Sequence, residues 1–144
     1  MKRLWVLGLF LIVAGCSDDA ASEMEPPADD VVLRVVVGSD VAADWTLPDL
    51  EDAAPFTELT ADGDVQSGPL LLDVLAASGL EDWTSGEVVG MGEGRVYEVG
   101  LDISSNEVDD GWILDVTNKG TLKLAAVDLP RQNWVRDVGE IRFP

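Results

Sequence analysis

The order of apolar and polar residues predicts many short strands and one clear helix. A β-branched run at residues 31–37 is typical of a strand that is covered on both faces. In residues 70–78, apolar residues recur at three- and four-residue spacing, with Pro69 placed for the first helical turn and Gly79 as a C-terminal stop. This segment predicts a helix whose apolar side has to cover a sheet.

Three hairpins are predicted where two extended runs flank a short turn: 56–60 with 64–66, 87–89 with 95–99, and 112–116 with 121–127. A short helical turn at 47–51, a loop at 101–110 and a last strand at 138–143 complete the pattern. Many short strands with one convincing helix predict an α+β domain, in which the helix packs on a mixed sheet.

The beginning of the chain carries the features of an export signal. Lys2 and Arg3 supply positive charge, and the apolar run 4–13 is too short to cross a hydrocarbon core of about 30 Å. Small residues then precede Cys16, the one cysteine of the chain. This order resembles a lipobox, in which the cysteine thiol is acylated with diacylglycerol and the signal is cleaved on its amino side.

The lipobox resemblance divides the chain into three parts. Residues 1–15 form the signal peptide, residues 16–30 form an acidic, proline-containing tether, and residues 31–144 form one folded domain. The tether has too little apolar surface to order itself. We expect the membrane to be a partner through the lipid on Cys16. Because Ser17 follows the cysteine, the expected place in the cell envelope is the outer membrane in preference to the inner membrane.

The chain is strongly acidic, with 28 Asp and Glu against 9 Lys and Arg and a net charge of −19 at pH 7. Such a surface repels nucleic acid and anionic lipid head groups, because both are bound through Lys and Arg. We therefore expect no nucleic-acid partner. Solubility, or adaptation to a salty medium, accounts for the charge.

Few side chains remain for chemistry. The sequence has no histidine, which removes imidazole catalysis and imidazole metal ligation, and Cys16 is committed to lipid. Adjacent acids such as Asp109 and Asp110 diverge on a strand, so they do not predict a catalytic pair. Four tryptophans fall in the folded part, and the core is the default position for each: Trp45, Trp83, Trp112 and Trp134.

Three segments, at residues 68–80, 120–130 and 134–141, occur in an order that resembles sulfite-oxidase-like, molybdopterin-dependent oxidoreductase domains. Residues 68–80 are similar to that family's turn and helix, which end in Ala-Ala-x-Gly. Residues 120–130 look like its Gly-Pro-Leu-Arg-Leu-Val-x-Pro strand, and residues 134–141 look like its Trp-Val-Arg-x-Val-x-x-Ile ending. The resemblance covers nearly the whole folded part.

The resemblance implies a mixed fold around a twisted sheet. In the family's enzymes it also implies a molybdenum cofactor held by one cysteine upstream of the helix. The equivalent stretch here, residues 56–68, contains no cysteine, and its hydroxyl groups are not comparable ligands. Positive charge is concentrated in four residues, which either line a remnant anion site or balance nearby acids, and we favour the second: Lys119, Lys123, Arg131 and Arg136.

These observations predict a noncatalytic binding or assembly module without a cofactor, whose ligand is an unidentified small molecule or envelope protein. The family's carboxy-terminal strands contribute to its cofactor cleft, so the candidate pocket residues are Tyr97, Trp112, Lys123, Arg131, Trp134 and Arg136. Two alternatives stay open. One is an oxidoreductase that holds molybdopterin without a protein thiolate, and the other is a structural envelope protein whose acidic surface binds divalent cations diffusely.

Overall fold

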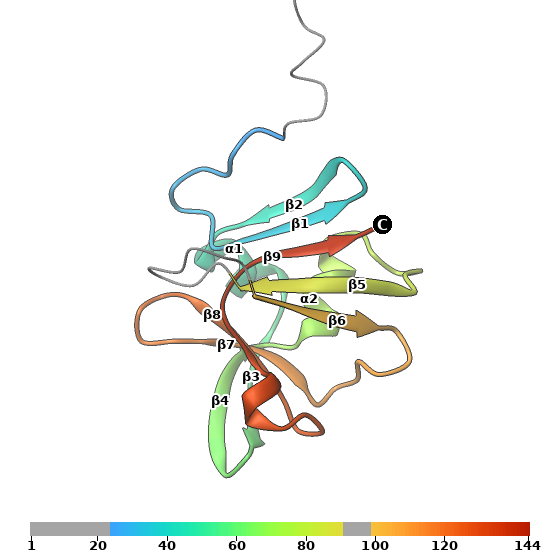
Figure 1. Ribbon diagram of the computed structural model, residues 1–144. Coiled ribbons are helices and arrows are strands. Elements are labelled where there is room, and N and C mark those ends of the chain that lie inside the picture. Colours follow the sequence, from blue (N-terminus) through green and yellow to red (C-terminus); the bar gives the residue numbers. More distant parts are fainter. Residues whose placement is uncertain (1–23, 91–98) are drawn as a thin grey trace, which may run out of the picture.

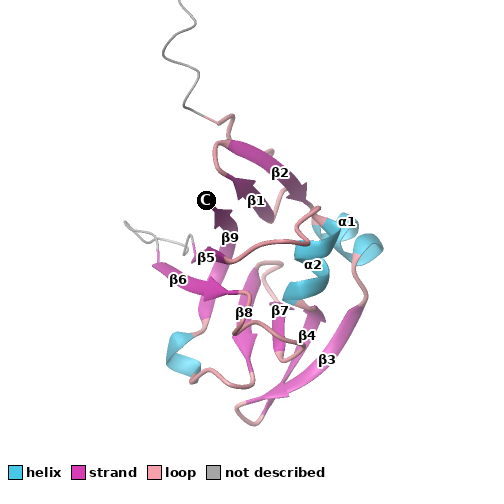
Figure 2. Cartoon of the chain, turned by 90° about the vertical axis from the view of Figure 1, so that its right-hand side faces the viewer, coloured by secondary structure: helices cyan, strands magenta, loops and turns pink. Residues whose placement is uncertain are grey.

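The computed structural model describes residues 24–90 and 99–144. These residues form a mixed α+β structure that is mostly sheet (Figure 2), as the sequence predicts at this level. The helices are α1 (Leu47–Ala53) and α2 (Leu71–Ala77). The strands are β1 (Leu33–Val37), β2 (Asp40–Trp45), β3 (Phe56–Ala61), β4 (Asp64–Pro69), β5 (Ser85–Gly90), β6 (Val99–Ser104), β7 (Trp112–Val116), β8 (Leu122–Ala126) and β9 (Val135–Phe143).

The main sheet has seven strands, and β9 lies at its centre. The order β2-β1-β9-β5-β6 can be followed from top to bottom in Figure 1, and β8, paired with β7, joins the other end of β9. The pairing of β1 with β9 is parallel, whereas the other pairings of this sheet are antiparallel. The sheet is mixed because β1 and β9, the first and last described strands, pair in parallel.

Strands β3 and β4 form a separate hairpin that crosses beside β7. Its turn consists of Asp62, with φ of 50°, and Gly63, with φ of 80°. Both values are left-handed, which a two-residue hairpin turn requires and which aspartate and glycine tolerate. The predicted turn is thus confirmed, and β4 extends three residues further than the predicted strand.

Helix α1 begins where local chemistry favours it, whereas α2 has no side-chain hydrogen bond at its N-terminus. In α1, the Thr46 hydroxyl accepts a hydrogen bond from the Asp49 N–H at 3.2 Å, and Pro48 occupies the first turn, where it loses no backbone hydrogen bond. The predicted helix α2 is confirmed to within a residue at each end. Its predicted start was wrong in one respect, since Pro69 is the last residue of β4 and pairs with Phe56.

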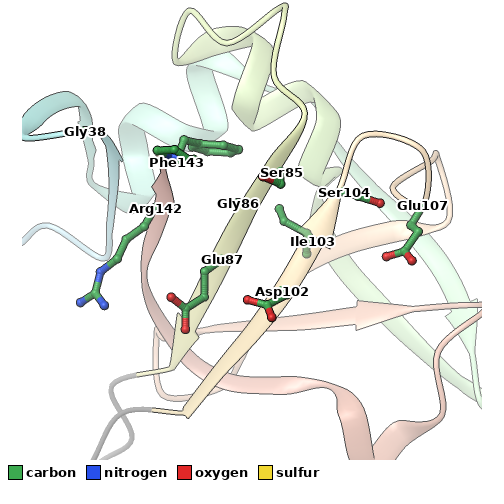
Figure 3. Close-up of a pocket in the computed structure, with 11 residues that line it drawn as sticks. Gly38, Ser85, Gly86, Glu87, Asp102, Ile103, Ser104, Glu107, Arg142 and Phe143 are labelled. Carbon is green, nitrogen blue, oxygen red and sulfur yellow. The ribbon is translucent and has the colours of Figure 1, made fainter.

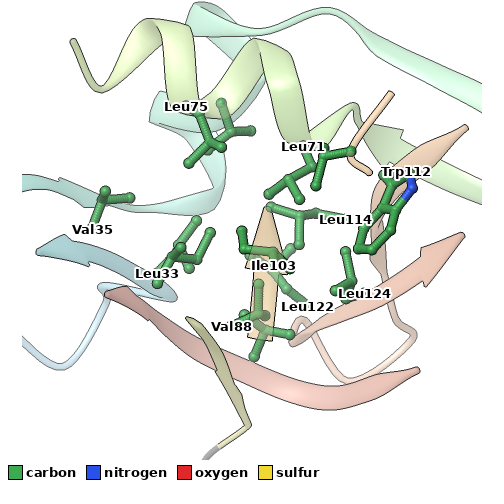
Figure 4. Close-up of a cluster of buried hydrophobic side chains, with 14 of the residues drawn as sticks. Leu33, Val35, Leu71, Leu75, Val88, Ile103, Trp112, Leu114, Leu122 and Leu124 are labelled. Atoms are coloured by element: carbon green, nitrogen blue, oxygen red, sulfur yellow. The ribbon is translucent and has the colours of Figure 1, made fainter. Parts of the chain in front are cut away.

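The core lies between one face of the main sheet and α2. Figure 4 shows Leu71 and Leu75 of α2 pointing towards side chains of the strands. Residues that are 0% exposed include Leu33, Leu114, Leu122 and Leu124. Each such burial is worth about 1.5–3 kcal/mol relative to leaving the side chain in water, so this cluster provides most of the domain's stability.

Strand β4 approaches the backbone of β7 unusually closely. The Ser67 N–H donates to a carboxylate oxygen of Asp115 at 2.7 Å. A Cβ atom on Gly68 would lie only 2.0 Å from the carbonyl oxygen of Leu114. Glycine at position 68 therefore allows the hairpin to dock against β7.

Two regions differ from the sequence prediction. Residues 101–104, predicted as part of a loop, belong to β6, and β2 had not been predicted as a full strand. The predicted strand at 95–99 falls almost entirely outside the described residues. Among the described residues, no helix has the length and apolar character needed to span a membrane.

Candidate functional site

Three of the predicted pocket residues meet around one indole ring. Trp134 follows a 3₁₀ turn at Arg131–Asn133, and Lys123 projects from β8. The Lys123 ammonium lies 5.7 Å from the centre of the Trp134 ring, and the Arg131 guanidinium carbon lies 5.3 Å from it. These are cation–π distances, so both cations contact the ring directly. We call Lys123, Arg131 and Trp134 the Trp134 cluster.

The ring of Trp134 is held in place from the other side. Its indole N–H donates to the carbonyl oxygens of Ala126 and Leu129, at 3.2 Å and 3.1 Å. Trp134 is half-buried, and an indole donor that is satisfied twice in this way fixes the orientation of the ring plane. The Trp134 cluster is therefore a preorganised feature of the fold.

Each cation of the cluster is already paired with a carboxylate. Lys123 lies 3.3 Å from the Asp115 carboxylate, and Arg131 lies 2.9 Å from the Asp62 carboxylate. Arg131 also bonds Asp64, and this hydrogen bond is the main reason why its pKa is raised. The sequence left two roles open for Lys123 and Arg131, an anion site or the balance of nearby acids, and favoured the second. In the structure both cations are paired with acids.

The remaining predicted residues do not join the cluster. Trp112 is 1% exposed and belongs to the core, so its predicted place in a pocket was wrong. Arg136 is exposed on β9, and Lys119 lies in the β7–β8 turn beside another cavity. Tyr97 lies outside the described residues. Bulk and aromatic character could not separate Trp112 from Trp134, because both properties suit a core and a pocket equally.

The Trp134 cluster does not fit a molybdenum cofactor. Its cations are neutralised by Asp62, Asp64 and Asp115, whereas a cofactor phosphate needs unpaired donors. Its donor set holds oxygen and nitrogen atoms and no sulfur, although a soft thiolate is what the family uses to fix the metal. Within residues 24–90 and 99–144, no group of three acidic, cysteine or histidine side chains converges as metal ligands would.

A cavity of about 930 Å³ lies where the tether meets the sheet, and we call it the tether cavity. Its apolar walls come from Pro27 of the tether, from Val31 and Val32 just before β1, and from β9. Its polar rim comes from β1, the β7–β8 turn and β9. The lining residues are Pro27, Val31, Val32, Arg34, Lys119, Gly120, Thr121, Asp137, Val138, Gly139 and Glu140. Apolar walls with a few polar groups are typical of a small-molecule site.

The backbone of β9 is irregular at the tether cavity. Asp137 has φ of 51°, and the register of β9 shifts beside it against both β8 and β5. Non-glycine residues with positive φ and bulged strands are concentrated at binding sites, where they redirect side chains. This irregularity is a second reason for treating the tether cavity as the candidate binding site.

A second cavity, of about 840 Å³, lies over β5, β6 and β9 (Figure 3). Glu87 is paired in register with Asp102 on one side and Arg142 on the other. Arg142 in turn donates to the Glu140 carboxylate at 2.5 Å. With Glu107 also in its lining, this cavity has more carboxylates than cations, so it is not a site for an anion.

Arg34 is the charged residue that the sequence analysis overlooked. It is 7% exposed and forms a two-pronged ion pair with Asp44 of β2, with N···O distances of 2.7 Å and 2.8 Å. The hydrogen bond from Arg34 is the main reason why the pKa of the Asp44 carboxyl lies below its ordinary value. A signal was present, because Arg34 is the one charged residue within the β-branched run 31–37.

We expect the free energy of unfolding to lose the contribution of this pair at acid pH. Because the pKa of Asp44 is lower in the folded state than in the unfolded state, the contribution is complete above the ordinary aspartate pKa of about 3.9. It is lost as the pH falls through the lowered folded-state pKa. Urea denaturation of the native chain and of Asp44→Asn should therefore show a difference in stability at neutral pH that narrows towards about pH 2.

The matched control for this measurement is Asp128→Asn, which removes an exposed carboxylate of the turn after β8. Surface substitutions of this kind change stability by less than about 0.5 kcal/mol. A difference between the native chain and Asp44→Asn that stays constant down to the lowest pH would contradict the assignment.

No protein-family model, no curated protein and no solved structure matches this chain.

Proposed function

We propose that this chain is a lipid-anchored protein of the cell envelope, on the outer membrane, whose sulfite-oxidase-like domain is a noncatalytic binding module. The anchor is the acyl group on Cys16, and the ligand is a small molecule or a segment of another envelope protein. The proposal combines the export signal, the α+β fold and the chemistry of the Trp134 cluster.

The observation that carries the noncatalytic part is the pairing of both cations in the Trp134 cluster. In the resembled family, positive charge near the carboxy-terminal strands faces an anionic cofactor. Here Lys123 and Arg131 face carboxylates from β7 and from the β3–β4 turn. An anion entering the cluster would have to displace these carboxylates and would meet their repulsion, which disfavours a pterin phosphate.

The tether cavity supports the binding part of the proposal. It combines apolar contact from Val31, Val32 and Val138 with hydrogen-bonding groups from Thr121 and the glycine backbone of the β7–β8 turn. Such a site binds by apolar burial and selects by a few polar contacts. The Thr121 hydroxyl shares a hydrogen bond of 2.7 Å with the hydroxyl of Thr117, which is not an activating base, and this favours binding over turnover at Thr121.

The test uses the full chain purified from its native host. We expect no stoichiometric molybdenum by elemental analysis, together with a small molecule that remains bound in native mass spectrometry. About one molybdenum atom per chain would overturn the noncatalytic proposal and favour the oxidoreductase alternative. Neither metal nor bound molecule would favour a structural envelope protein.

A matched pair of variants locates the ligand. Val31→Trp adds bulk to a wall of the tether cavity, and Val127→Trp adds the same bulk at an exposed position after β8. If the bound mass is lost in Val31→Trp but kept in Val127→Trp, the ligand is assigned to the tether cavity. Equal retention in both variants would show that this cavity is not the site.

A further inference from the structure

The end of the tether is bonded to the folded domain. The Arg34 guanidinium uses two of its N–H directions on Asp44, and its remaining Nη1 donates to the main-chain carbonyl of Glu25. Arginine presents its donors in a rigid fork, so the geometry that satisfies Asp44 also aims the third donor at the tether. The sequence predicts an unstructured tether over residues 16–30. Residues 16–23 lie outside the described residues, and Glu25 is bonded to the domain through Arg34.

Two further main-chain hydrogen bonds continue the docking towards β1. The Val31 N–H donates to Ala28 at 3.0 Å, which closes a turn, and the Val32 N–H donates to Trp45 at 2.8 Å, which extends the β1–β2 ladder. Pro27, Val31 and Val32 then form one wall of the tether cavity. The contact at Glu25 is therefore the outermost of a series that runs along the tether into the sheet.

We propose that Arg34 is a clamp that fixes residues 25–32 to the domain and thereby sets how far the domain can move from the membrane. The proposal rests on the proposed function for one element, the acyl anchor on Cys16. With the clamp closed, only residues 17–25 separate the lipid from the domain, and a fully extended chain of that length spans about 30 Å. With the clamp open, the separation extends to Val32 and reaches about 55 Å.

Charge complements this limit. The chain carries a net charge of −19, so an anionic head-group surface repels it. At physiological ionic strength the repulsion is screened within about 8 Å, well inside the reach of the closed tether. The domain consequently stays off the lipid surface but within about 30 Å of it, and the partner that fits this placement is a protein or ligand held at the same membrane surface.

The clamp also decides whether the tether cavity is complete. Since Pro27, Val31 and Val32 supply one wall, a molecule that fills the cavity binds the closed arrangement more tightly than the open one. By linkage, such a molecule closes the clamp to the same extent that the clamp strengthens its binding. Ligand binding and the reach of the domain are thus coupled through Arg34.

The clamp is tested first on soluble Cys16→Ser protein, by amide hydrogen exchange. In the native background we expect the Val31 and Val32 amides to be protected. Arg34→Lys keeps a positive charge beside Asp44 but lacks the fork, and we expect at least a tenfold faster exchange at Val31, with unchanged exchange at Val88 in the core. Arg136→Lys, the same change at an exposed position, should leave all of these amides unchanged.

The reach is tested on lipidated protein in vesicles, by energy transfer from a dye on Asp40→Cys, at the exposed start of β2, to acceptors in the head groups. Arg34→Lys should lower the transfer, and Arg136→Lys should not. Unprotected Val31 in the native background, or equal protection in Arg34→Lys, would overturn the clamp. Because the exchange experiment needs no lipid, failure of Cys16 acylation and failure of the clamp are read separately.

Discussion

Gly68→Ala is expected to destabilise the folded domain by about 3 kcal/mol, at the upper end of the range for overpacked positions. The new Cβ would lie 2.0 Å from the carbonyl oxygen of Leu114 and 3.3 Å from the main-chain nitrogen of Val116. Both atoms belong to the backbone of β7, so neither can rotate away, and the hairpin has to shift as a unit. A lower midpoint in urea denaturation, with an unchanged m-value, measures the effect.

Gly100→Ala is the matched control, because it makes the same substitution in β6. There the Cβ would lie 1.9 Å from a carboxylate oxygen of Glu87, the far end of a flexible side chain. That side chain can move at small cost, so we expect a change of less than about 1 kcal/mol. Similar midpoints for the two variants would show that the β4–β7 contact is looser than described.

Cys16→Ser is expected to move the protein from the membrane fraction to the soluble fraction. Each buried methylene of an acyl chain contributes about 0.8 kcal/mol to membrane affinity, and anchors with more than one chain are durable, so loss of acylation removes nearly all of the attachment. Fractionation of cells, followed by mass analysis of the mature N-terminus, measures both location and lipid.

Ser17→Ala serves as its control, since it changes the neighbouring hydroxyl but keeps the thiol that is acylated. This variant should remain with the membrane and retain the mass of the lipid. Membrane association of Cys16→Ser at the level of the native chain would refute the lipid anchor, and with it the limit on reach that was inferred from the tether.

Hairpins with strong turn residues could be predicted from the sequence. Around Asp62 and Gly63, and again between β7 and β8, apolar runs flank residues that accept unusual backbone angles, so pattern and turn chemistry agree. Helix α2 was predictable for the same reason, because its apolar spacing and its C-terminal Gly79, with φ of 85°, indicate one element.

Strand β2 lacked such a signal. Its residues are mostly exposed, so its side chains give no apolar alternation. It forms a strand because its backbone hydrogen-bonds to β1, and this pairing leaves no mark in the side-chain pattern of β2. The later part of β6 was hidden in the same way, since Asp102 and Gly100 lower the local strand propensity although both pair with β5 in register. Edge strands of this kind are specified by their neighbours.

The candidate site could be predicted only in part. The family resemblance made Lys123, Arg131 and Trp134 candidates for one pocket, and in the structure they lie together around one ring. No local pattern could show that Asp62 and Asp64, far away in the chain, lie beside Arg131. The tether cavity was not predicted at all. It depends on the tether returning to the sheet through Arg34, and a polar, acidic segment contains no apolar periodicity that would indicate such a return.

The central place of β9 affects the order in which this protein can fold during synthesis. Strand β9 follows every other described strand in the chain, yet it hydrogen-bonds to β1, β5 and β8. Until it emerges, β1 and β5 have no partner between them, and long-range pairing of this kind makes folding slow. The main sheet can therefore close only after the last segment of the chain has been synthesised.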